Sequence, residues 1–411
     1  MNNKVLFIDN DSGFTGSTIS LGYLIQGFCD NNYDVFVLTA KSEVFSEFYV
    51  KLGAKPIFFR FPKMENFYLD LHFTNKEPFF TFRSFIKFIK NILKYFVGLY
   101  VTYRKIKEIN PDLLYLNEYV VIQSALAGHL MKIPTVTHVR SRYLDGTFGI
   151  RNYLLSKSLV KFNDLIFAIS KQEADQITKF YHAKYEKVFV VGEFLNEENF
   201  RNLSNIDILK KKFNLPIGGK IVLMLGGILP IKGTIDFIKA AQIVIEKNEN
   251  AYFVIAGKIP PNNDKLLGNY FAECMEITNL PEIKTSLKFT GEVRNVHELI
   301  ACCDILVSSS TETHFSRPII EAWAMKKAVI ATETEHTKDL VENNINGLIV
   351  KISSPNEIAL AILKLLHNKE LLVNIGIEGY DKAIKFYNAK TNLKIICEKC
   401  ATLINKTSKS V

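Results

Sequence analysis

The stretch DILVSSSTETHFSRPIIEAWAMKKAVIAT, Asp304 to Thr332, holds one complete unit of the pattern that decides the fold. Its apolar run Ile305 to Val307 predicts a buried strand. A helix is predicted to begin at Pro318, because proline is tolerated in a first helical turn. A second apolar run, Ala328 to Thr332, predicts the next strand. Strand, helix and strand in this order indicate a parallel sheet with a helix across one face.

The same alternation continues in both directions along the chain. We expect strands at 4–9, 34–40, 56–61, 112–117, 134–139, 164–170 and 187–194, and again at 221–228, 251–258, 286–293, 304–310, 328–332 and 347–352. Helices are expected between most of them, including 18–29, 234–247, 296–302, 318–326, 355–366 and 370–386, with an amphipathic helix at 391–404. The polar residues 196–220 are interpreted as the connection between two domains. The prediction is an α/β protein with two doubly wound domains that face a cleft, where ligands lie beyond the strand ends.

Composition supports a soluble globular protein of two domains. The chain has 411 residues, of which 48% are hydrophobic and 23% charged. The beginning MNNKVLFID does not resemble a signal peptide, and the longest apolar run, Ile221 to Ile231, is too short to span a bilayer. The six cysteines show no disulfide spacing, and Cys397 and Cys400 form a lone C-x-x-C. We expect reduced thiols and a cytoplasmic location.

The positive charge is concentrated in one aromatic segment. Residues 51–107 carry 12 Lys and Arg against 3 Asp and Glu, and they hold 11 of the 31 phenylalanines. Arg83, Lys87, Lys90 and Lys94 follow one stripe of a helix. Either the apolar side is core and the cations are its solvated face, or residues 79–107 bind an anionic membrane peripherally. The second interpretation is favoured, because the aromatic content exceeds what a narrow core stripe needs. Nucleic acid is not expected, because no binding motif accompanies the basic residues.

Polar side chains crowd the junction between strand and helix in the first stretch. Glu312, His314 and Arg317 place an acid, an imidazole and a guanidinium within six residues. The main-chain N–H groups of residues 315–317 are expected to face a ligand, and Glu321, about one turn into the helix, to accept hydrogen bonds from sugar hydroxyls. Each residue also has a plainer interpretation. His314 would be a turn residue, Glu312 a solvated loop charge, and Glu321 an acid that interacts only with the helix dipole.

A second junction, LMLGGILPIKGTIDFIKAA (223–241), combines glycines with a cation. Gly226 and Gly227 follow the strand, and Lys232 with Gly233 precedes the helix. A lysine beside a helix N-terminus fits a diphosphate, whose charge must be neutralised when it leaves. The alternative is a surface lysine followed by a turn glycine, and the functional interpretation is favoured.

The third junction, DNDSGFTGSTISLGYL (9–24), has glycines that allow a ligand to approach the backbone. Gly13 and Gly16 precede a helix whose N–H groups suit phosphate. The spacing is neither that of a dinucleotide-binding loop nor that of a P-loop. A plain tight turn is an equally good interpretation.

Several segments in the same order resemble the group 1, or family 4, nucleotide-sugar-dependent glycosyltransferases. They are DLIFAISKQEADQI (164–177), LGGILPIKG (225–233), KFTGEVRNVHELIACCDILV (288–307), the first stretch (304–332) and GLIVKISSPNEIALAILKLL (347–366). The resemblance covers essentially the whole chain and implies the GT-B fold of two Rossmann-like domains. It implies an acceptor-binding domain at 1–200, a nucleotide-sugar-binding domain at 201–385, and a C-terminal helix and tail at 386–411 that pack back toward the first domain.

The resemblance also implies roles for matching residues. Lys232 matches the lysine that grips the donor diphosphate, and Glu321 matches the second acid of the E-x7-E motif, which contacts the ribose. Gly16 resembles the glycine near the phosphates, and His138 a histidine near the transferred sugar, with a buried structural histidine as the favoured alternative. Val293 falls where the family lines the base pocket.

The sequence departs from the family pattern at two positions. The arginine expected five residues before Lys232 is Gly227, and the first acid of E-x7-E is Thr313, with Glu312 one position early. Arg317 is the candidate for the missing positive charge, and Thr313 and His314 for sugar recognition. The expected catalytic residues are Lys232, His138 and Glu321. The expected donor-binding residues are Gly16, Gly227, Lys232, Val293, Thr313, His314, Phe315, Ser316, Arg317 and Glu321.

The resemblance implies an enzyme that transfers a sugar from a nucleoside-diphosphate sugar to a glycan or lipid-linked glycan acceptor with retention. Synthesis of a bacterial cell-surface polysaccharide, such as lipopolysaccharide, capsule or exopolysaccharide, is expected. No Asp-x-Asp motif stands in a suitable place, so no metal and no other cofactor is expected. The alternatives are a nucleotide-sugar epimerase of the same fold, or a catalytically impaired partner protein.

Overall fold

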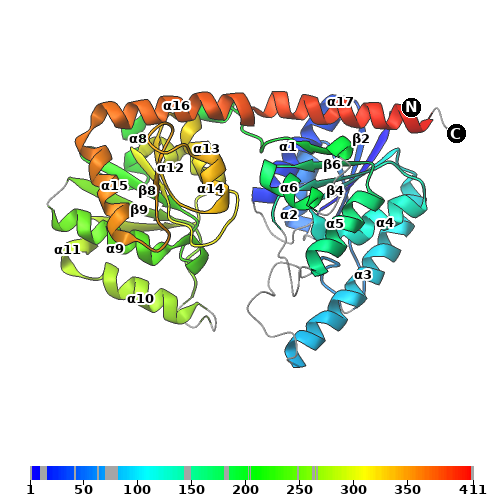
Figure 1. Cartoon of the computed structure of the whole chain (residues 1–411), viewed down its shortest axis with the longest axis horizontal. Coiled ribbons are helices and arrows are strands. Elements are labelled where there is room, and N and C mark those ends of the chain that lie inside the picture. The colour runs from blue at the N-terminus through cyan, green and yellow to red at the C-terminus, as the bar shows by residue number, and fades with distance from the viewer. Residues whose placement is uncertain are drawn as a thin grey trace. The chain divides into compact units, whose positions relative to one another are not determined.

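The computed structural model describes residues 2–9, 16–40, 43–62, 64–69, 82–142, 150–179, 185–201, 203, 205–247, 250–261, 264 and 267–408. The chain forms two compact units, Met1–Phe194 with Ala389–Val411, and Leu195–Asn388. Each unit contains one parallel sheet with helices on both faces (Figure 1). The predicted fold class, with two doubly wound domains, is confirmed.

The sheet of the first unit has the strand order β3-β2-β1-β4-β5-β6-β7. The strands are β3 (Lys55–Phe58), β2 (Asp34–Thr39), β1 (Lys4–Ile8), β4 (Leu113–Asn117), β5 (Thr135–Val139), β6 (Leu165–Ala168) and β7 (Val188–Val190). β1 pairs with β2 on one side and with β4 on the other. The strand order therefore reverses between β1 and β4.

Alternate residues of β1 serve the two faces of this sheet, because successive strand side chains point in opposite directions. Val5 and Phe7 pack in one cluster with residues of α1 (Gly16–Asp30) and of the C-terminal α17 (Ala389–Ser408). Leu6 and Ile8 pack in another with α3 to α6. Those helices are α3 (Phe82–Ile109), α4 (Ile122–Leu130), α5 (Ile150–Phe162) and α6 (Lys171–Thr178), and α2 is Glu43–Lys51. The C-terminal helix thus packs on the first unit, as predicted.

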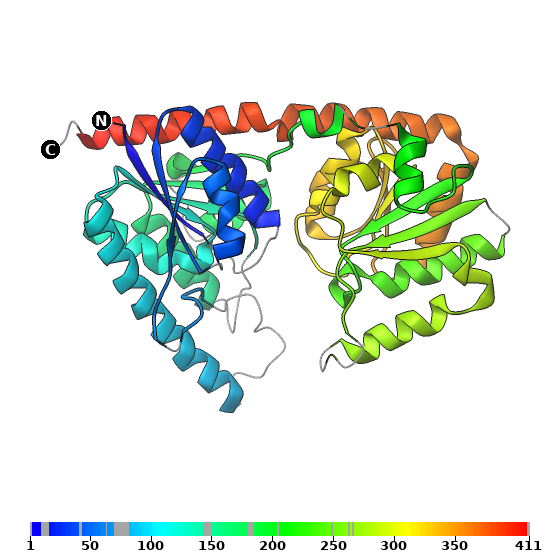
Figure 2. The same cartoon turned by 180° about the vertical axis from the view of Figure 1, so that it is seen from behind.

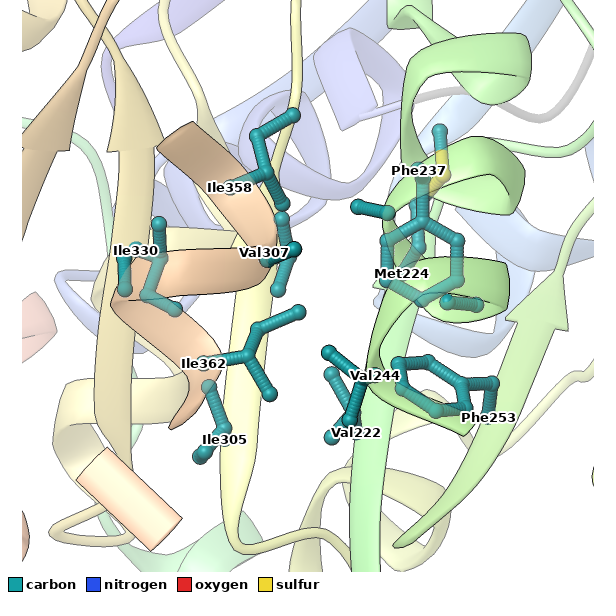
Figure 3. Close-up of a cluster of buried hydrophobic side chains, with 14 of the residues drawn as sticks. Val222, Met224, Phe237, Val244, Phe253, Ile305, Val307, Ile330, Ile358 and Ile362 are labelled. Atoms are coloured by element: carbon teal, nitrogen blue, oxygen red, sulfur yellow. The ribbon is translucent and has the colours of Figure 1, made fainter. Parts of the chain in front are cut away.

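The sheet of the second unit has the order β10-β9-β8-β11-β12-β13. One face is covered by α9 (Thr234–Glu246) and α15 (Pro355–His367), whose apolar side chains meet those of the strands (Figure 3). The other face is covered by α8 (Ile206–Lys212), α12 (Val296–Cys302), α13 (Arg317–Ala324) and α16 (Lys369–Tyr387). The strands are β8 (Lys220–Leu225), β9 (Ala251–Ala256), β10 (Leu287–Gly291), β11 (Ile305–Ser308), β12 (Ala328–Thr332) and β13 (Leu348–Val350). The shorter helices are α7 (Glu198–Arg201), α10 (Gly268–Thr278), α11 (Pro281–Lys284) and α14 (Glu335–Leu340).

Every predicted strand is present, within a few residues of its expected bounds. The interpretation of residues 196–220 as a connection between domains is wrong. These residues include α7 and α8 and belong to the second unit. Leu209 and Leu215 are buried in its core, where α8 lies against α12. A few apolar residues among many polar ones are enough to anchor a short helix that is exposed on its other sides.

Candidate functional site

Each unit has one place where the strand order reverses. Ligands of doubly wound sheets bind at such a place, beyond the carboxyl ends of the strands. In the second unit this place lies between β8 and β11. Met224 of β8 is the register partner of Val307 of β11, so the loops that leave the two strands begin side by side. The loop after β8 leads to Lys232, and the loop after β11 leads to the start of α13. These two loops form the candidate site.

The glycine pair after β8 is in a conformation that side chains disfavour. Gly226 has φ 130° and Gly227 has φ 74°. A Cβ atom added to Gly227 would lie 2.3 Å from the main-chain oxygen of Lys258, which follows β9. The main-chain N–H of Gly227 donates to Ala256 at 2.9 Å. An arginine therefore does not fit this backbone, and the N–H of Gly227, a predicted donor-binding residue, is already used inside the protein.

Lys232 ends a single 3-10 turn, Pro230–Lys232, and Gly233 follows with φ 64°. The main-chain oxygen of Lys232 accepts a hydrogen bond of 2.9 Å from Ser309 Oγ, which ties this turn to the loop after β11. Burial lowers the pKa of the Lys232 ammonium to about 8, because the charged form loses water. The predicted lysine is also one of the residues that line the pocket at this place.

The ammonium of Lys232 contacts the imidazole of His314. Lys232 Nζ lies 2.6 Å from His314 Nε2, and His314 Nδ1 lies 3.0 Å from the main-chain oxygen of Glu312. A carbonyl oxygen can only accept, so Nδ1 carries the proton and Nε2 accepts from the ammonium. Burial, and secondly the nearby charge of Lys232, lower the pKa of His314 to about 4. The imidazole is therefore neutral around pH 7.

A small pocket rich in hydroxyl groups lies next to this pair. Its walls include Lys232 and Pro318 and four serines, Ser308, Ser309, Ser310 and Ser316. Ser308 Oγ and Ser316 Oγ are 3.0 Å apart. Serine hydroxyls can both donate and accept, so the pocket presents hydrogen-bonding groups together with one cation. Groups of this kind can hydrogen-bond the oxygen atoms of an anion.

The start of α13 brings two predicted residues together. Pro318 occupies its first turn, as predicted, and Ser316 stands at the N-cap. Arg317 Nε donates to Glu321 Oε1 at 2.8 Å, one turn apart on the helix. Both side chains are partly buried. The two residues to which the sequence assigns separate roles thus form an ion pair with each other.

The remaining predicted residues of this unit differ in their surroundings. Thr313 Oγ1 accepts a hydrogen bond of 3.2 Å from the amide of Glu335. The Phe315 ring packs against His336 and Tyr387, with centroid distances of 6.3 and 5.9 Å, so its side chain serves the core. Val293 is partly buried against the same core cluster. Neither Phe315 nor Val293 is among the residues that line the pocket.

The first unit has a polar cluster at its own reversal point, which the sequence analysis did not identify. Glu118 follows β4 and has φ 108°, a strained value for a residue with a side chain. Its carboxylate accepts hydrogen bonds from the amides of Tyr119 and Arg140, at 3.0 and 3.1 Å, and from Ser141 Oγ at 3.0 Å. Burial raises the pKa of Glu118 to about 8, against the effect of these donors. The polar pair Asn117-Glu118 directly after a buried strand was the available sequence signal.

Arg140 links this cluster to the end of the unit. Its Nη1 lies 2.9 Å from Glu193 Oε1, and its Nε donates to Asn117 Oδ1 at 2.8 Å. Ser20 donates to the other oxygen of Glu193. The arginine and the glutamate are 4% and 7% exposed, so this ion pair is screened little by solvent. It joins β5, α1 and the residues after β7.

His138 lies on β5 and is fully buried. Its ring is surrounded by Tyr115, Phe167 and Phe194, and its Nδ1 lies 3.0 Å from the hydroxyl of Tyr115. Burial and then the charge of Arg140 lower its pKa well below the usual value. This environment is that of a core histidine, and the contact with a transferred sugar stays a prediction.

The first glycine loop is described only in part. Gly16 is the first residue of α1, and Gly13 lies outside the described residues. The structure thus brings together Lys232, His314 and Ser316, with Arg317 and Glu321 adjacent on α13, and it places His138 and Gly16 in the first unit.

Two family models match the chain, and each lies mostly within one of the two structural units. Residues 14–198 match the family model described as Glycosyltransferase Family 4, and residues 205–382 match the one described as Glycosyl transferases group 1. One relative is N,N'-diacetylbacillosaminyl-diphospho-undecaprenol alpha-1,3-N-acetylgalactosaminyltransferase of Campylobacter jejuni. The two sequences are 22% identical over 410 residues, and this alignment covers 94% of this chain and 95% of the relative. The chain is also 24% identical over 243 residues to the putative glycosyltransferase EpsD of Bacillus subtilis. This alignment covers 58% of this chain and 61% of EpsD.

Solved structures show the same architecture. The crystal structure of Anabaena HepE in complex with UDP superposes with a TM-score of 0.78 at 18% sequence identity, and covers 97% of this chain and 100% of HepE. At this identity the likeness establishes the GT-B fold.

Proposed function

We propose that this chain is a group 1 glycosyltransferase that transfers a sugar from a nucleoside-diphosphate sugar to an acceptor hydroxyl with retention of the anomeric configuration. The observation that carries the proposal is the contact of Lys232 with His314 at the edge of a serine-lined pocket. The bond between the anomeric carbon and the diphosphate oxygen breaks, a bond to the acceptor oxygen forms, and the acceptor proton passes to the departing diphosphate. Neither the epimerase nor the partner-protein alternative is favoured by the family match.

The groups in the candidate site suit a departing diphosphate. The ammonium of Lys232 supplies positive charge in a partly dry site, where electrostatic stabilisation is stronger than in water. Within the described residues, the main-chain N–H groups of Phe315 and Ser316 donate to no other residue, and we propose that they bind phosphate oxygens at the start of α13. The contribution of Phe315 is then its backbone, because its ring packs in the core.

Glu321 is the proposed contact for the ribose hydroxyls, as the family resemblance implies. Its ion pair with Arg317 holds the carboxylate in one orientation. Arg317 remains a candidate for a phosphate contact. To make this contact, its guanidinium would give up a hydrogen bond to Glu321 and donate to a phosphate oxygen instead. If Arg317→Ala leaves donor binding and turnover unchanged, this second role is wrong.

We propose a glycan or lipid-linked glycan as the acceptor, in the synthesis of a bacterial cell-surface polysaccharide. The Campylobacter relative, by its name, acts on a sugar linked to diphospho-undecaprenol, which is a membrane lipid carrier. An acceptor of this kind would require the enzyme to work at a membrane surface.

The N-terminal half of α3 supports peripheral contact with a membrane. The side chains of Phe88, Leu93 and Phe96 are 57%, 54% and 62% exposed, and Lys90 is exposed between them. The other half of the helix packs on α4, where Thr102 Oγ1 and Ser124 Oγ are 2.8 Å apart. The N-terminal half of α3, which extends past its contact with α4, points away from the sheet (Figure 2). The interpretation as core thus describes the second half of α3, where Val97, Ile106 and Ile109 are buried, and the exposed first half supports the membrane proposal.

We propose that residues 86–96 of α3 insert apolar side chains into the interface of an anionic membrane. Across the described part of the chain, every helix is too short or too polar to cross a bilayer. A helix that lies on the membrane surface needs only one apolar side with nearby cations. The side chains of Arg83 and Lys87, predicted as part of the cationic stripe, lie outside the described residues.

The deciding experiment is a transfer assay with purified protein, a set of nucleotide sugars and a lipid-linked glycan acceptor. Transfer with the anomeric configuration retained supports the proposal, and reaction of a donor without acceptor supports an epimerase or hydrolase instead. Among the described residues no three His, Cys, Asp or Glu side chains are grouped as metal ligands, and metal independence stays a prediction. Loss of activity with EDTA would contradict it.

A further inference from the structure

Position 227 does not supply the second cation that a diphosphate would meet. Position 227, where the resemblance places an arginine, has φ 74° and lies against the main chain of Lys258, so no side chain fits there. Arg317 is paired with Glu321. The nitrogen-bearing side chain in direct contact with Lys232 is instead His314, which stands at an unspecified position of the family pattern.

The hydrogen bonds of His314 define what this residue can do. Its Nδ1–H donates to the carbonyl of Glu312 and orients the ring, while Nε2 accepts from the Lys232 ammonium at 2.6 Å. Nε2 is thus the acceptor that meets the Lys232 ammonium. An incoming phosphate oxygen is a better acceptor for that ammonium than a neutral imidazole, because it is charged.

We propose that His314 is a proton-linked second cation of the donor site: the diphosphate replaces Nε2 as the acceptor for Lys232, and the imidazole then takes one proton from solvent and donates from Nε2 to a phosphate oxygen. This inference rests on the proposed function. It adds that donor binding takes up a proton and that His314 binds the diphosphate rather than the sugar hydroxyls. No covalent bond changes in this step, and the proton comes from the buffer.

The groups around His314 agree with this behaviour. Lys232, on the turn after β8, and His336, on α14, both act to keep the free imidazole neutral, together with burial. Glu312, in the same loop, presents its carbonyl to Nδ1, and Glu321, on α13, pairs with Arg317. A diphosphate brings negative charge into this setting, and an opposite charge within about 4–6 Å favours the protonated imidazole.

Isothermal titration calorimetry tests the proposal directly. UDP, GDP, CDP, ADP and inorganic pyrophosphate are titrated into the full chain at about pH 7, in buffers that differ in ionisation enthalpy. The slope of the observed enthalpy against buffer ionisation enthalpy gives the protons taken up. His314→Gln is expected to take up about one proton fewer than the unmodified protein and to bind the same diphosphate about tenfold or more weakly.

A matched control separates this effect from a general change in charge. His367, an exposed histidine in the last turn of α15, belongs to the same unit, and His367→Gln is expected to leave both proton uptake and affinity unchanged. Circular dichroism and the thermal midpoint show whether His314→Gln is folded. Should that variant not fold, ¹⁵N NMR of the imidazoles in the unmodified protein replaces it, and one ring is expected to gain a proton at Nε2 when the diphosphate binds.

The outcomes distinguish this inference from the proposed function. Binding with equal proton uptake in both proteins, or binding without a change of imidazole protonation, overturns the role of His314 and leaves the glycosyltransferase proposal intact. Absence of binding for every diphosphate, together with absence of transfer, overturns both.

Discussion

A Cβ atom added to Gly233 would lie 1.9 Å from the main-chain oxygen of Ser309. The residue after Lys232 therefore touches the loop after β11, and the close approach is possible because glycine has no side chain. The same approach allows Ser309 Oγ to donate to the main-chain oxygen of Lys232 at 2.9 Å. Gly233 thus sets the position of the lysine relative to the serine pocket.

Gly233→Ala is expected to separate these loops and to weaken diphosphate binding by about tenfold or more. A left-handed residue with a side chain costs about 1–2 kcal/mol, and the clash with Ser309 adds to it. Gly218→Ala is the control, since no atom lies within 4 Å of a Cβ added at that position. Calorimetry with a nucleoside diphosphate checks the result, and equal affinity of the two variants would count against the role of Gly233.

Gly227→Arg is expected not to improve the donor site, although it restores the family residue. Gly227 and Gly291 have similar φ values, 74° and 72°, but a Cβ atom meets the backbone of Lys258 only at position 227. Gly291→Ala should therefore lose about 1–2 kcal/mol of stability from its backbone conformation alone, and Gly227→Ala should lose more. Thermal unfolding midpoints compare the two, and a smaller loss for Gly227→Ala would show that the loop can move aside.

Glu193→Gln is expected to destabilise the protein by about 3–5 kcal/mol, because it leaves the buried Arg140 without its charge partner. The pair Lys239 and Glu273 is largely exposed and 3.5 Å apart, so Glu273→Gln should change stability by less than about 1 kcal/mol. Urea unfolding measures both. The double variant Arg140→Met with Glu193→Leu should lose less unfolding free energy than Glu193→Gln alone, because it leaves no unpaired buried charge. A larger loss in the double variant would contradict this explanation.

Donor affinity is expected to fall above about pH 8 as Lys232 loses its proton. Because burial lowers the pKa of Lys232 to about 8, the ammonium is present below that pH and lost above it. The experiment uses the His314→Gln background, so that the imidazole does not contribute. There, affinity should be constant up to about pH 8 and then fall about tenfold per pH unit. Lys232→Arg in the same background should remove the fall, since guanidinium stays charged.

Leu93→Ser with Phe96→Ser is expected to reduce binding to vesicles that contain anionic lipid, because burying each of these side chains contributes about 1.5–3 kcal/mol. Lys90→Gln with Lys94→Gln should reduce binding to anionic vesicles only. The control is Leu360→Ser on α15, where the leucine is 61% exposed. Vesicle sedimentation measures all variants, and equal binding of the α3 variants and the control would assign another role to this surface.

The sequence by itself determined the elements and their alternation. Apolar runs such as 305–307 and 328–332 are strands because their periodicity is a local property, and Pro318 marks the start of α13 for an equally local reason. The glycines around Lys232 and the cationic character of α3 could be predicted in the same way. The segment 196–220 could not, because two short helices there are stabilised by distant core residues rather than by their own pattern.

Only the tertiary structure decided which side chains meet. Lys232 and His314 are 82 positions apart, and Arg140 and Glu193 are 53 apart, so no local pattern relates them. Strand order places β8 beside β11 and brings the two loops together. The exclusion of an arginine at Gly227 depends in the same way on a neighbouring loop. Periodicity follows from the geometry of one helix or strand, whereas a site depends on packing between elements that the chain connects only at long range.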